Sequence, residues 1–325
     1  MIVSTWQTLT RPRSTAVALG NFDGVHLGHR RILEELLRES SALGLDPVAL
    51  TFDPHPRAFF FPEKSTHLLT PAAEKETLIR AFGVDLVTLP FDAALAGLEA
   101  TEFAREILIG RLRGACFFLG PGHRFGKGAL GDGELLRQVL GPGDSIRVRE
   151  ISPVETRGET VSSSAIRHRL KAGEIEAANS MLGRPYALQG VVERGAERGR
   201  TLGFPTANIL LHDVRKALPA FGVYGGMARI QGEDYPAIAN IGLRPTFGEK
   251  IPRVEVHLLG QNKDLYNLEI EFSLIRFIRP ETAFASVEAL KRQISADIAN
   301  WEGYLGGLST FNNGSRTDSQ GAVFI

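Results

Sequence analysis

The sequence predicts an α/β plus β protein, in which a parallel-sheet domain precedes a small antiparallel β-barrel closed by a helix. Its 325 residues exceed the usual length of one domain. Strand-like and helical segments alternate through the first half, which is typical of a parallel sheet covered by helices. Farther along, short β-prone runs are separated by Gly and Pro, which is typical of an antiparallel sheet.

The first half is expected to contribute the elements of the parallel sheet in order. Strands are expected at 15–19, 46–52, 85–91, 115–119 and 145–151. Apolar residues at helical spacing predict helices at 28–43, 71–82, 101–112 and 163–182. Thr70-Pro71 and Thr101-Glu102 are expected to start two of them, because a hydroxyl can cap a free N–H and Pro or an acid suits the first turn. Such sheets bind ligands beyond the carboxyl ends of their strands.

The break Gly183-Arg184-Pro185 separates the predicted domains, which span 1–183 and 184–305. The second domain is expected to hold strands at Tyr186–Val192, Gly222–Ile230, Ala237–Ile241, Val254–Leu259 and Leu268–Ile278. A helix over 286–305 would then present one apolar face, made of Val287, Leu290, Ile294, Ile298 and Trp301. Residues 306–325 begin with a Gly-, Ser-, Thr- and Asn-rich stretch without periodicity and are expected to form a disordered tail.

The composition limits the kinds of partner. Lys+Arg and Asp+Glu both number 37, so no overall field attracts a nucleic acid and any phosphate site must be local. The one cysteine, Cys116, excludes an internal disulfide and sits in an apolar run typical of an inert buried strand. No run of 18 apolar residues and no signal segment is present, which predicts a cytoplasmic protein without a membrane partner. The pattern does not indicate an oligomeric state.

The stretch G-N-F-D-G-V-H-L-G-H at 20–29 joins the first strand to the first helix. Gly24 and Gly28 allow backbone N–H groups to approach a ligand, and the helix N-terminus favours an anion. His26 and His29 could donate hydrogen bonds to a triphosphate during displacement at phosphorus. Two alternatives are a zinc site, because the spacing is H-x-x-H, and simple capping or surface histidines.

Other polar clusters in the first half have both a structural and a functional interpretation. The segment V-S-S-S-A-I-R at 161–167 opens a helix, so its serines either cap that helix or form an anion site together with Arg167. The segment F-D-P-H-P at 52–56 follows the second strand and forms either a rigid turn or a binding loop.

In the second half, Thr206 and Asn208 are two residues apart in an extended segment, so their oxygens face the same way. Neutral oxygens suit Mg²⁺, although such side chains usually bond to nearby backbone. Glu255 and His257 are expected on one strand face, with Val254 and Val256 on the other. Glu255 is then either a solvated residue or the carboxylate that deprotonates a hydroxyl.

These motifs together resemble the bacterial FAD synthetase family, the bifunctional riboflavin kinase/FMN adenylyltransferases. The loop 20–29 is similar to the H-x-G-H signature of nucleotidyltransferases, and T-F-D-P-H-P at 51–56, V-S-S-S-A-I-R, L-G-R-P-Y at 182–186 and L-G-F-P-T-A-N at 202–208 follow in the family's order. The segments G-V-Y at 222–224, N-I-G-L-R-P-T-F at 240–247 and V-E-V-H-L-L at 254–259 agree as well. The resemblance spans about residues 14–305 and implies a Rossmann-like nucleotidyltransferase domain and a riboflavin kinase barrel.

The resemblance also implies roles for individual residues. The barrel would phosphorylate riboflavin with ATP, with Mg²⁺ on Thr206 and Asn208 and with Glu255 as base; the first domain would adenylylate FMN to FAD, with His26 and His29 stabilising the transition state. Nucleotide-binding residues would be Asn21, Phe22, Asp23, Gly24, Gly28, Ser163, Ser164, Arg167, Gly195, Gly199, Arg200 and Gly203. Flavin-binding residues would be Phe52, Asp53, Pro54, His55 and Pro56.

One segment departs from the family pattern. Where the family usually carries G-x-D/N-F-x-F-G, this chain has Gly120-Pro121-Gly122-His123-Arg124-Phe125-Gly126. The exchange at Gly122 and His123 leaves open a rival in which the kinase half alone is active. A second rival is a flavin-binding regulator without turnover. A chromatographic assay for riboflavin, FMN and FAD separates the three hypotheses.

Overall fold

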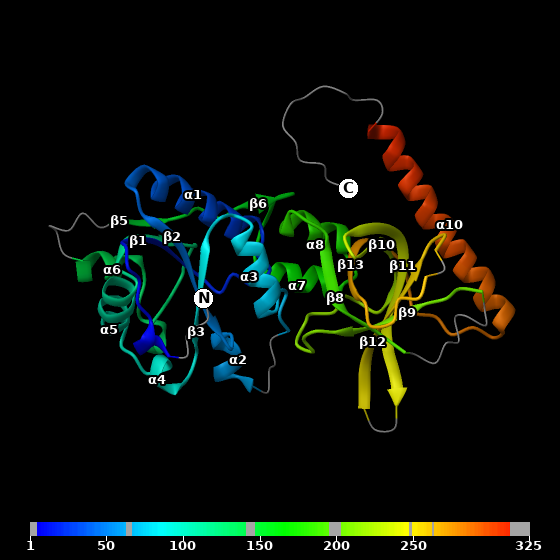
Figure 1. Cartoon of the computed structure of the whole chain (residues 1–325), viewed down its shortest axis with the longest axis horizontal. Helices are drawn as coiled ribbons and strands as arrows, with labels where there is room; N and C mark the ends of the chain where they lie inside the picture. The colour runs from blue at the N-terminus through cyan, green and yellow to red at the C-terminus, as the bar shows by residue number, and fades with distance from the viewer. Residues whose placement is uncertain are drawn as a thin grey trace. The chain divides into compact units, whose positions relative to one another are not determined.

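The structure is a computed structural model that describes residues 5–62, 67–140, 147–194, 203–246, 249–261 and 263–312. The chain divides into two compact units, Met1–Ser163 and Ser164–Ile325. Figure 1 shows helices around a sheet in the first unit and a barrel with one long helix in the second. Among the described residues, no helix has both the length and the apolar character needed to cross a membrane.

A five-stranded parallel sheet forms the centre of the first unit, in the order β3-β2-β1-β4-β5. Its strands are β1 (Thr15–Leu19), β2 (Asp46–Asp53), β3 (Asp85–Pro90), β4 (Gly114–Leu119) and β5 (Arg147–Glu150). All five were predicted from their apolar runs. Every residue of β1 is buried, as expected for a central strand covered on both faces. Cys116 is buried in β4, and burial raises the pKa of its thiol.

The helices of the first unit are more broken than the sequence predicts. They are η1 (Trp6–Thr8), α1 (Leu27–Leu43), α2 (Pro56–Phe60), α3 (Ala72–Arg80), α4 (Ala93–Ala96), α5 (Ala100–Glu102), the π-helix η3 (Phe103–Arg111), η4 (Lys127–Ala129) and α6 (Gly133–Leu140). A two-stranded ribbon of β6 (Glu155–Thr156) and β7 (Glu159–Thr160) follows β5. The expected helix at 163–182 is two helices, α7 (Ser163–Lys171) and α8 (Ile175–Leu182), which belong to the second unit from Ser164 onward.

Both expected threonine caps were wrong. Pro71, whose side chain has no capping group, is the N-cap of α3, and the Thr70 hydroxyl one residue earlier accepts a hydrogen bond from Gly24 N. At α5 the N-cap is Glu99, whose backbone N–H donates to Glu102. The Thr70 hydroxyl thus bonds to the loop 20–29, and Thr101 lies inside α5 and not at its N-cap.

The second unit contains a closed antiparallel barrel, in the order β10-β11-β12-β9-β8-β13. Its strands are β8 (Tyr186–Glu193), β9 (Ala207–Leu211), β10 (Gly222–Ile230), β11 (Glu233–Thr246), β12 (Glu249–Leu258) and β13 (Glu269–Pro280). The predicted alternation on β12 is confirmed, since Val254, Val256 and Leu258 are buried inside the barrel. Glu255 and His257 therefore lie on its outer face.

The long helix α10 (Val287–Asn312) packs against the outside of the barrel (Figure 1). Trp301 is fully buried and lies against Gly225 of β10, whereas Val287 at the start of the helix is half exposed. The expected apolar face is therefore correct at Trp301 and wrong at Val287. The helix continues to Asn312, into the stretch expected to be a disordered tail, and 313–325 lies outside the described residues.

Candidate active sites

The loop between β1 and α1 has a backbone that few residue types adopt. Phe22, Gly24 and Val25 all have positive φ angles, of 48°, 90° and 41°. Gly28 follows in the first turn of α1, where a Cβ would lie 3.2 Å from the ring of His26. The tight loop and the glycine together bring the His26 ring close to the first turn of α1.

The two histidines of this loop form a stacked pair. Their ring centroids are 3.6 Å apart and their planes differ by 16°. His26 is buried and caps α1, because its Nδ1 accepts a hydrogen bond from His29 N at 3.3 Å. His26 is therefore a capping residue, as one of the alternatives expected, and the capping bond orients its imidazole at the start of α1. In the described part of the chain, no three His, Cys, Asp or Glu side chains gather as metal ligands would.

Asp23 joins this loop to two other segments. Its carboxylate accepts a hydrogen bond from Thr70 N at 3.0 Å, and the Thr70 hydroxyl accepts one from Gly24 N at 2.9 Å. The backbone carbonyl of Asp23 accepts a bond from the Ser163 hydroxyl at 2.8 Å. The predicted nucleotide-binding residues Asp23, Gly24 and Ser163 are therefore close together, and Asp23 and Ser163 hold the loop in place.

A buried lysine lies behind this loop, and the sequence analysis did not identify it. Lys75 of α3 is 7% exposed, and its Nζ is 3.5 Å from the Thr51 hydroxyl at the end of β2. Burial lowers the pKa of Lys75, and the Asp23 and Asp53 carboxylates act in the opposite direction. The available signal was a lysine one turn before Ile79 on the buried face of the predicted helix.

The flavin-binding candidates lie where β2 ends. Asp53 is the last residue of β2, and His55 caps α2 by accepting a hydrogen bond from Arg57 N at 3.1 Å. The Asp53-Pro54 peptide bond is cis, and Pro56 starts α2. Phe52 packs against an aromatic cluster that includes Phe91 and Phe103. A small cavity touches Phe52, Asp53 and His55 as well as Lys75.

Other predicted nucleotide-binding residues are only partly located. Asn21 lies in the same loop, where its backbone carbonyl accepts a hydrogen bond from the Thr51 hydroxyl. Ser164 and Arg167 lie in the first two turns of α7, the former exposed and the latter half-buried. Gly203 has a φ of 90°. Gly195, Gly199 and Arg200 lie outside the described residues.

The segment 120–126 after β4, which departs from the family pattern, contains a histidine with a shifted pKa. Burial lowers the pKa of His123 to about 4, so the ring is neutral near pH 7. Gly122 has a φ of 62°, a conformation that glycine and asparagine adopt more readily than other residues. Arg124 forms an ion pair with Asp132 at 2.6 Å.

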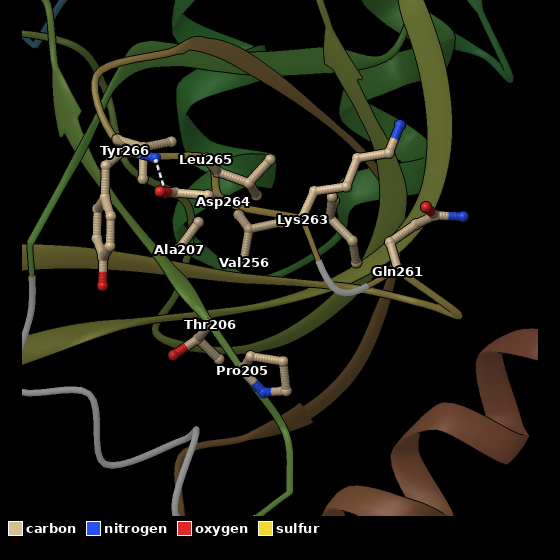
Figure 2. Close-up of a pocket in the computed structure, with 11 residues that line it drawn as sticks. Pro205, Thr206, Ala207, Val256, Gln261, Lys263, Asp264, Leu265 and Tyr266 are labelled. Atoms are coloured by element: carbon tan, nitrogen blue, oxygen red, sulfur yellow. Dashed lines mark hydrogen bonds between the residues drawn. The ribbon is translucent and has the colours of Figure 1, made fainter.

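Two cavities of similar size open in the second unit. The first, of about 320 Å³, is lined by buried barrel residues such as Val256 and by Gln261 and residues 263–266, and Figure 2 shows Tyr266, Asp264 and Lys263 around it. The second, of about 310 Å³, lies on the outer face of the barrel between β10–β13 and α10. Thr206 lines both cavities, and Glu255 lines the second.

Three polar side chains meet beside Thr206. Glu255 and Asn208 are directly opposite each other on the paired strands β12 and β9. Arg253 donates from Nε to Asn208 Oδ1 at 2.7 Å and forms an ion pair with Glu255. On the same face, His257 Nδ1 lies 2.7 Å from the carbonyl oxygen of Pro205 and helps to fix the segment that carries Thr206. The sequence analysis missed Arg253, and only its spacing of two residues from Glu255 hinted at the contact.

Comparisons with known proteins follow the same division. Residues 8–165 match the FAD synthetase family model, and residues 182–305 match the riboflavin kinase model named Flavokinase. A bifunctional riboflavin kinase/FMN adenylyltransferase from Pseudomonas fluorescens is 38% identical over 289 residues, which cover 88% of this chain and 92% of that protein. The chain belongs to the bifunctional riboflavin kinase/FMN adenylyltransferase family.

Other members of this bifunctional family show similar agreement. The Escherichia coli K12 protein of the same description is 38% identical over 86% of this chain and 90% of its own length. The Bacillus subtilis protein is 34% identical, with 87% and 90% covered. A crystal structure described as a macrolide-efflux protein from Streptococcus pneumoniae superposes with a TM-score of 0.85 at 30% identity, covering 92% of this chain and 97% of that one.

Proposed function

We propose that the barrel unit transfers the γ-phosphoryl group of ATP to riboflavin to give FMN, and that the parallel-sheet unit joins FMN to the AMP part of a second ATP to give FAD. Family membership over most of the chain supports both steps. The observation that carries the kinase assignment is that Thr206 lines both cavities and Glu255 lines one of them.

The two cavities suit the two substrates of the kinase step. Riboflavin is assigned to the cavity on the outer face, because a base must reach the hydroxyl that it deprotonates and Glu255 lines this cavity. ATP is assigned to the cavity beside residues 263–266, where the Tyr266 ring offers an aromatic surface (Figure 2). The γ-phosphoryl group then meets the hydroxyl near Thr206.

Glu255 accepts the proton of the 5′-hydroxyl as the new oxygen–phosphorus bond forms. The bond from the γ-phosphorus to the bridging oxygen breaks, and ADP leaves. Because Asn208 is opposite Glu255 on the neighbouring strand, the strand pairing fixes the base and the amide side by side. That register is what orients the carboxylate toward the cavity.

The residues at this position fit a magnesium ion. The Thr206 hydroxyl and the Asn208 amide oxygen are neutral oxygen donors of the kind that magnesium takes, and the Asn208 amide turns its oxygen toward Arg253. A magnesium ion bound by Thr206 and Asn208 would neutralise charge on the ATP phosphates. The side chains of the site would position the riboflavin hydroxyl, and Glu255 would remove its proton.

For the adenylylation step, an FMN phosphate oxygen attacks the α-phosphorus of ATP, and the bond to the β-phosphate oxygen breaks to release pyrophosphate. No protein nucleophile is required, because the FMN phosphate is ionised near pH 7. The stacked His26 and His29 lie at the start of α1, where their ring nitrogens can donate to the triphosphate. Ser163, Ser164 and Arg167 are assigned to the same nucleotide, and residues 52–56 to the flavin.

The test follows both reactions in one assay. Purified protein is incubated with riboflavin, ATP and Mg²⁺, and the three flavins are separated by chromatography over time. We expect FMN to rise and then convert to FAD. FMN without FAD would limit the activity to the barrel unit, and unchanged riboflavin would refute the kinase assignment.

Two variants test the division of labour. Glu255→Gln should slow FMN formation by about 10²–10⁴-fold, the usual contribution of a general base, while added FMN is still adenylylated. His29→Ala should have the converse effect. If either folded variant loses both reactions, the assignment of one reaction to each unit is wrong.

A further inference from the structure

We infer that Arg253 is a positioning residue of the phosphoryl-transfer site, which holds Asn208 and Glu255 together without nucleotide and releases Asn208 when the metal–nucleotide complex binds. This inference rests on the proposed kinase function. It concerns a residue outside the motifs that assign the activity, and it makes a prediction that those motifs do not make.

The contacts of Arg253 place its charge at the centre of the site. Arg253 and Glu255 are separated by the buried Val254, so both side chains leave the same face of β12. From there Nε reaches Asn208 Oδ1 at 2.7 Å, while Nη2 pairs with Glu255. The side chains of Arg253 and Glu255 are 31% and 22% exposed, so the pair is partly shielded from water.

The Asn208 contact conflicts with metal binding. Magnesium takes oxygen ligands at about 2.0–2.1 Å in near-octahedral geometry. A guanidinium nitrogen on the same amide oxygen would bring a second positive charge close to the ion. The amide oxygen has two lone pairs, so it is the repulsion between the two charges that favours release of Nε from Asn208 when the metal binds, and the positive charge of Arg253 opposes that binding.

The Glu255 contact has the opposite consequence. A guanidinium presents donors in a rigid fork, so Nη2 can stay with the carboxylate after Nε has left the amide. The retained ion pair keeps Glu255 oriented toward the cavity assigned to riboflavin. One side chain is thus expected to weaken metal binding and to speed phosphoryl transfer.

The experiment measures these two effects separately in the full-length protein. Mn²⁺ is titrated into protein with saturating ADP and its binding is followed by electron paramagnetic resonance, which needs no turnover. For Arg253→Gln we expect Mn²⁺ to bind about 3–10-fold more tightly, because a unit positive charge near the ion has been removed. We also expect kcat for FMN formation to fall about 10-fold, a part of the usual contribution of a general base.

Two further variants keep the result interpretable. Arg229→Gln removes an arginine that pairs with Asp234 on the exposed β10–β11 hairpin, and it should change neither quantity. Arg253→Lys keeps the charge but lacks the fork, so Mn²⁺ affinity should stay near that of the natural protein while kcat falls. A thermal melt of each variant identifies any that is unfolded.

The outcomes divide clearly. Unchanged or weaker Mn²⁺ binding by folded Arg253→Gln would overturn the competition, and tighter binding with unchanged kcat would overturn the role at Glu255. Should the natural protein form no FMN, the proposed function fails, while the Mn²⁺ titration still reports whether Arg253 competes with a cation.

Discussion

The contact between Gly225 and Trp301 predicts how a single methyl group would change both stability and riboflavin binding. An alanine Cβ at Gly225 would lie 2.5 Å from Trp301 Cδ2, and Trp301 is fully buried. Overpacking of a buried site costs about 1–3 kcal/mol, and the alanine recovers about 0.5–1 kcal/mol of backbone entropy. We therefore expect Gly225→Ala to lose about 1–2 kcal/mol and to lower the Tm by roughly 2–8 °C.

The same change should affect the kinase substrate. Leu290, Ile294 and Asp297 of α10 line the cavity assigned to riboflavin, so a shift of the helix at Trp301 would alter that cavity. Thermal unfolding and the KM for riboflavin measure the two effects, and adenylylation of added FMN should not change. Gly303→Ala is the matched control, because a Cβ there meets nothing within 4 Å and alanine favours a helix.

The reasoning would be refuted if Gly225→Ala matched the natural protein in both Tm and KM. A second variant tests the cause of any loss. Gly225→Ala combined with Trp301→Phe removes part of the colliding ring, so it should be more stable than the sum of the two single changes predicts. Simple additivity would show that the two residues do not collide.

Two further predictions concern the first unit. Burial lowers the pKa of His123 from 6.5 to about 4, so the unfolded chain binds a proton at this residue more readily than the folded chain does. The free energy of unfolding should therefore be highest above pH 6.5 and should fall toward pH 4, by at most about 3 kcal/mol. His123→Phe should flatten that part of the pH dependence in thermal melts, and an unchanged slope would contradict it. Lys75→Met removes the buried ammonium that interacts with Asp23 and Asp53 and should slow adenylylation, with riboflavin phosphorylation unaffected. Because burial opposes the ammonium more strongly than the two carboxylates favour it, the free energy of unfolding should change little or rise. Denaturant unfolding and the two-step flavin assay measure this, and a variant with full adenylylation would exclude a role for Lys75.

The parts of the fold that depend on a repeating pattern were predictable from sequence. The buried runs of β1 to β4 and the alternation around Glu255 follow from strand-like patterns in the sequence, whereas the edge strand β5 is mostly exposed. The extent of β11 and β12 was underestimated, because Pro245 and Pro252 lie within these strands although proline usually marks a strand end. Pairing with neighbours across a closed barrel overrides that local preference.

The site was predictable where a motif supplies the ligand contacts, and not where distant residues meet. For the loop 20–29 and for Thr206 and Asn208, spacing left a structural alternative open, the family resemblance supplied the functional role, and that role stays a prediction. The bond between Thr70 and Gly24 links residues 46 positions apart, so no local pattern contains it. The path of the Arg253 side chain depends on its rotamer, which the spacing does not fix.

Lys75 and Arg253 each place a positive charge beside the motif residues of one unit. The chain carries equal numbers of acidic and basic residues, so it has no overall field to attract ATP or FMN phosphates. Each unit instead places one cation beside the acidic or amide residues of its motif: Lys75 beside Asp23 and Asp53, and Arg253 beside Asn208 and Glu255. In a partly shielded site such a charge acts strongly at short range and weakly elsewhere. Lys75 and Arg253 therefore contribute local positive charge to the two proposed sites, as Lys263 and Arg279 do in the cavities of the second unit.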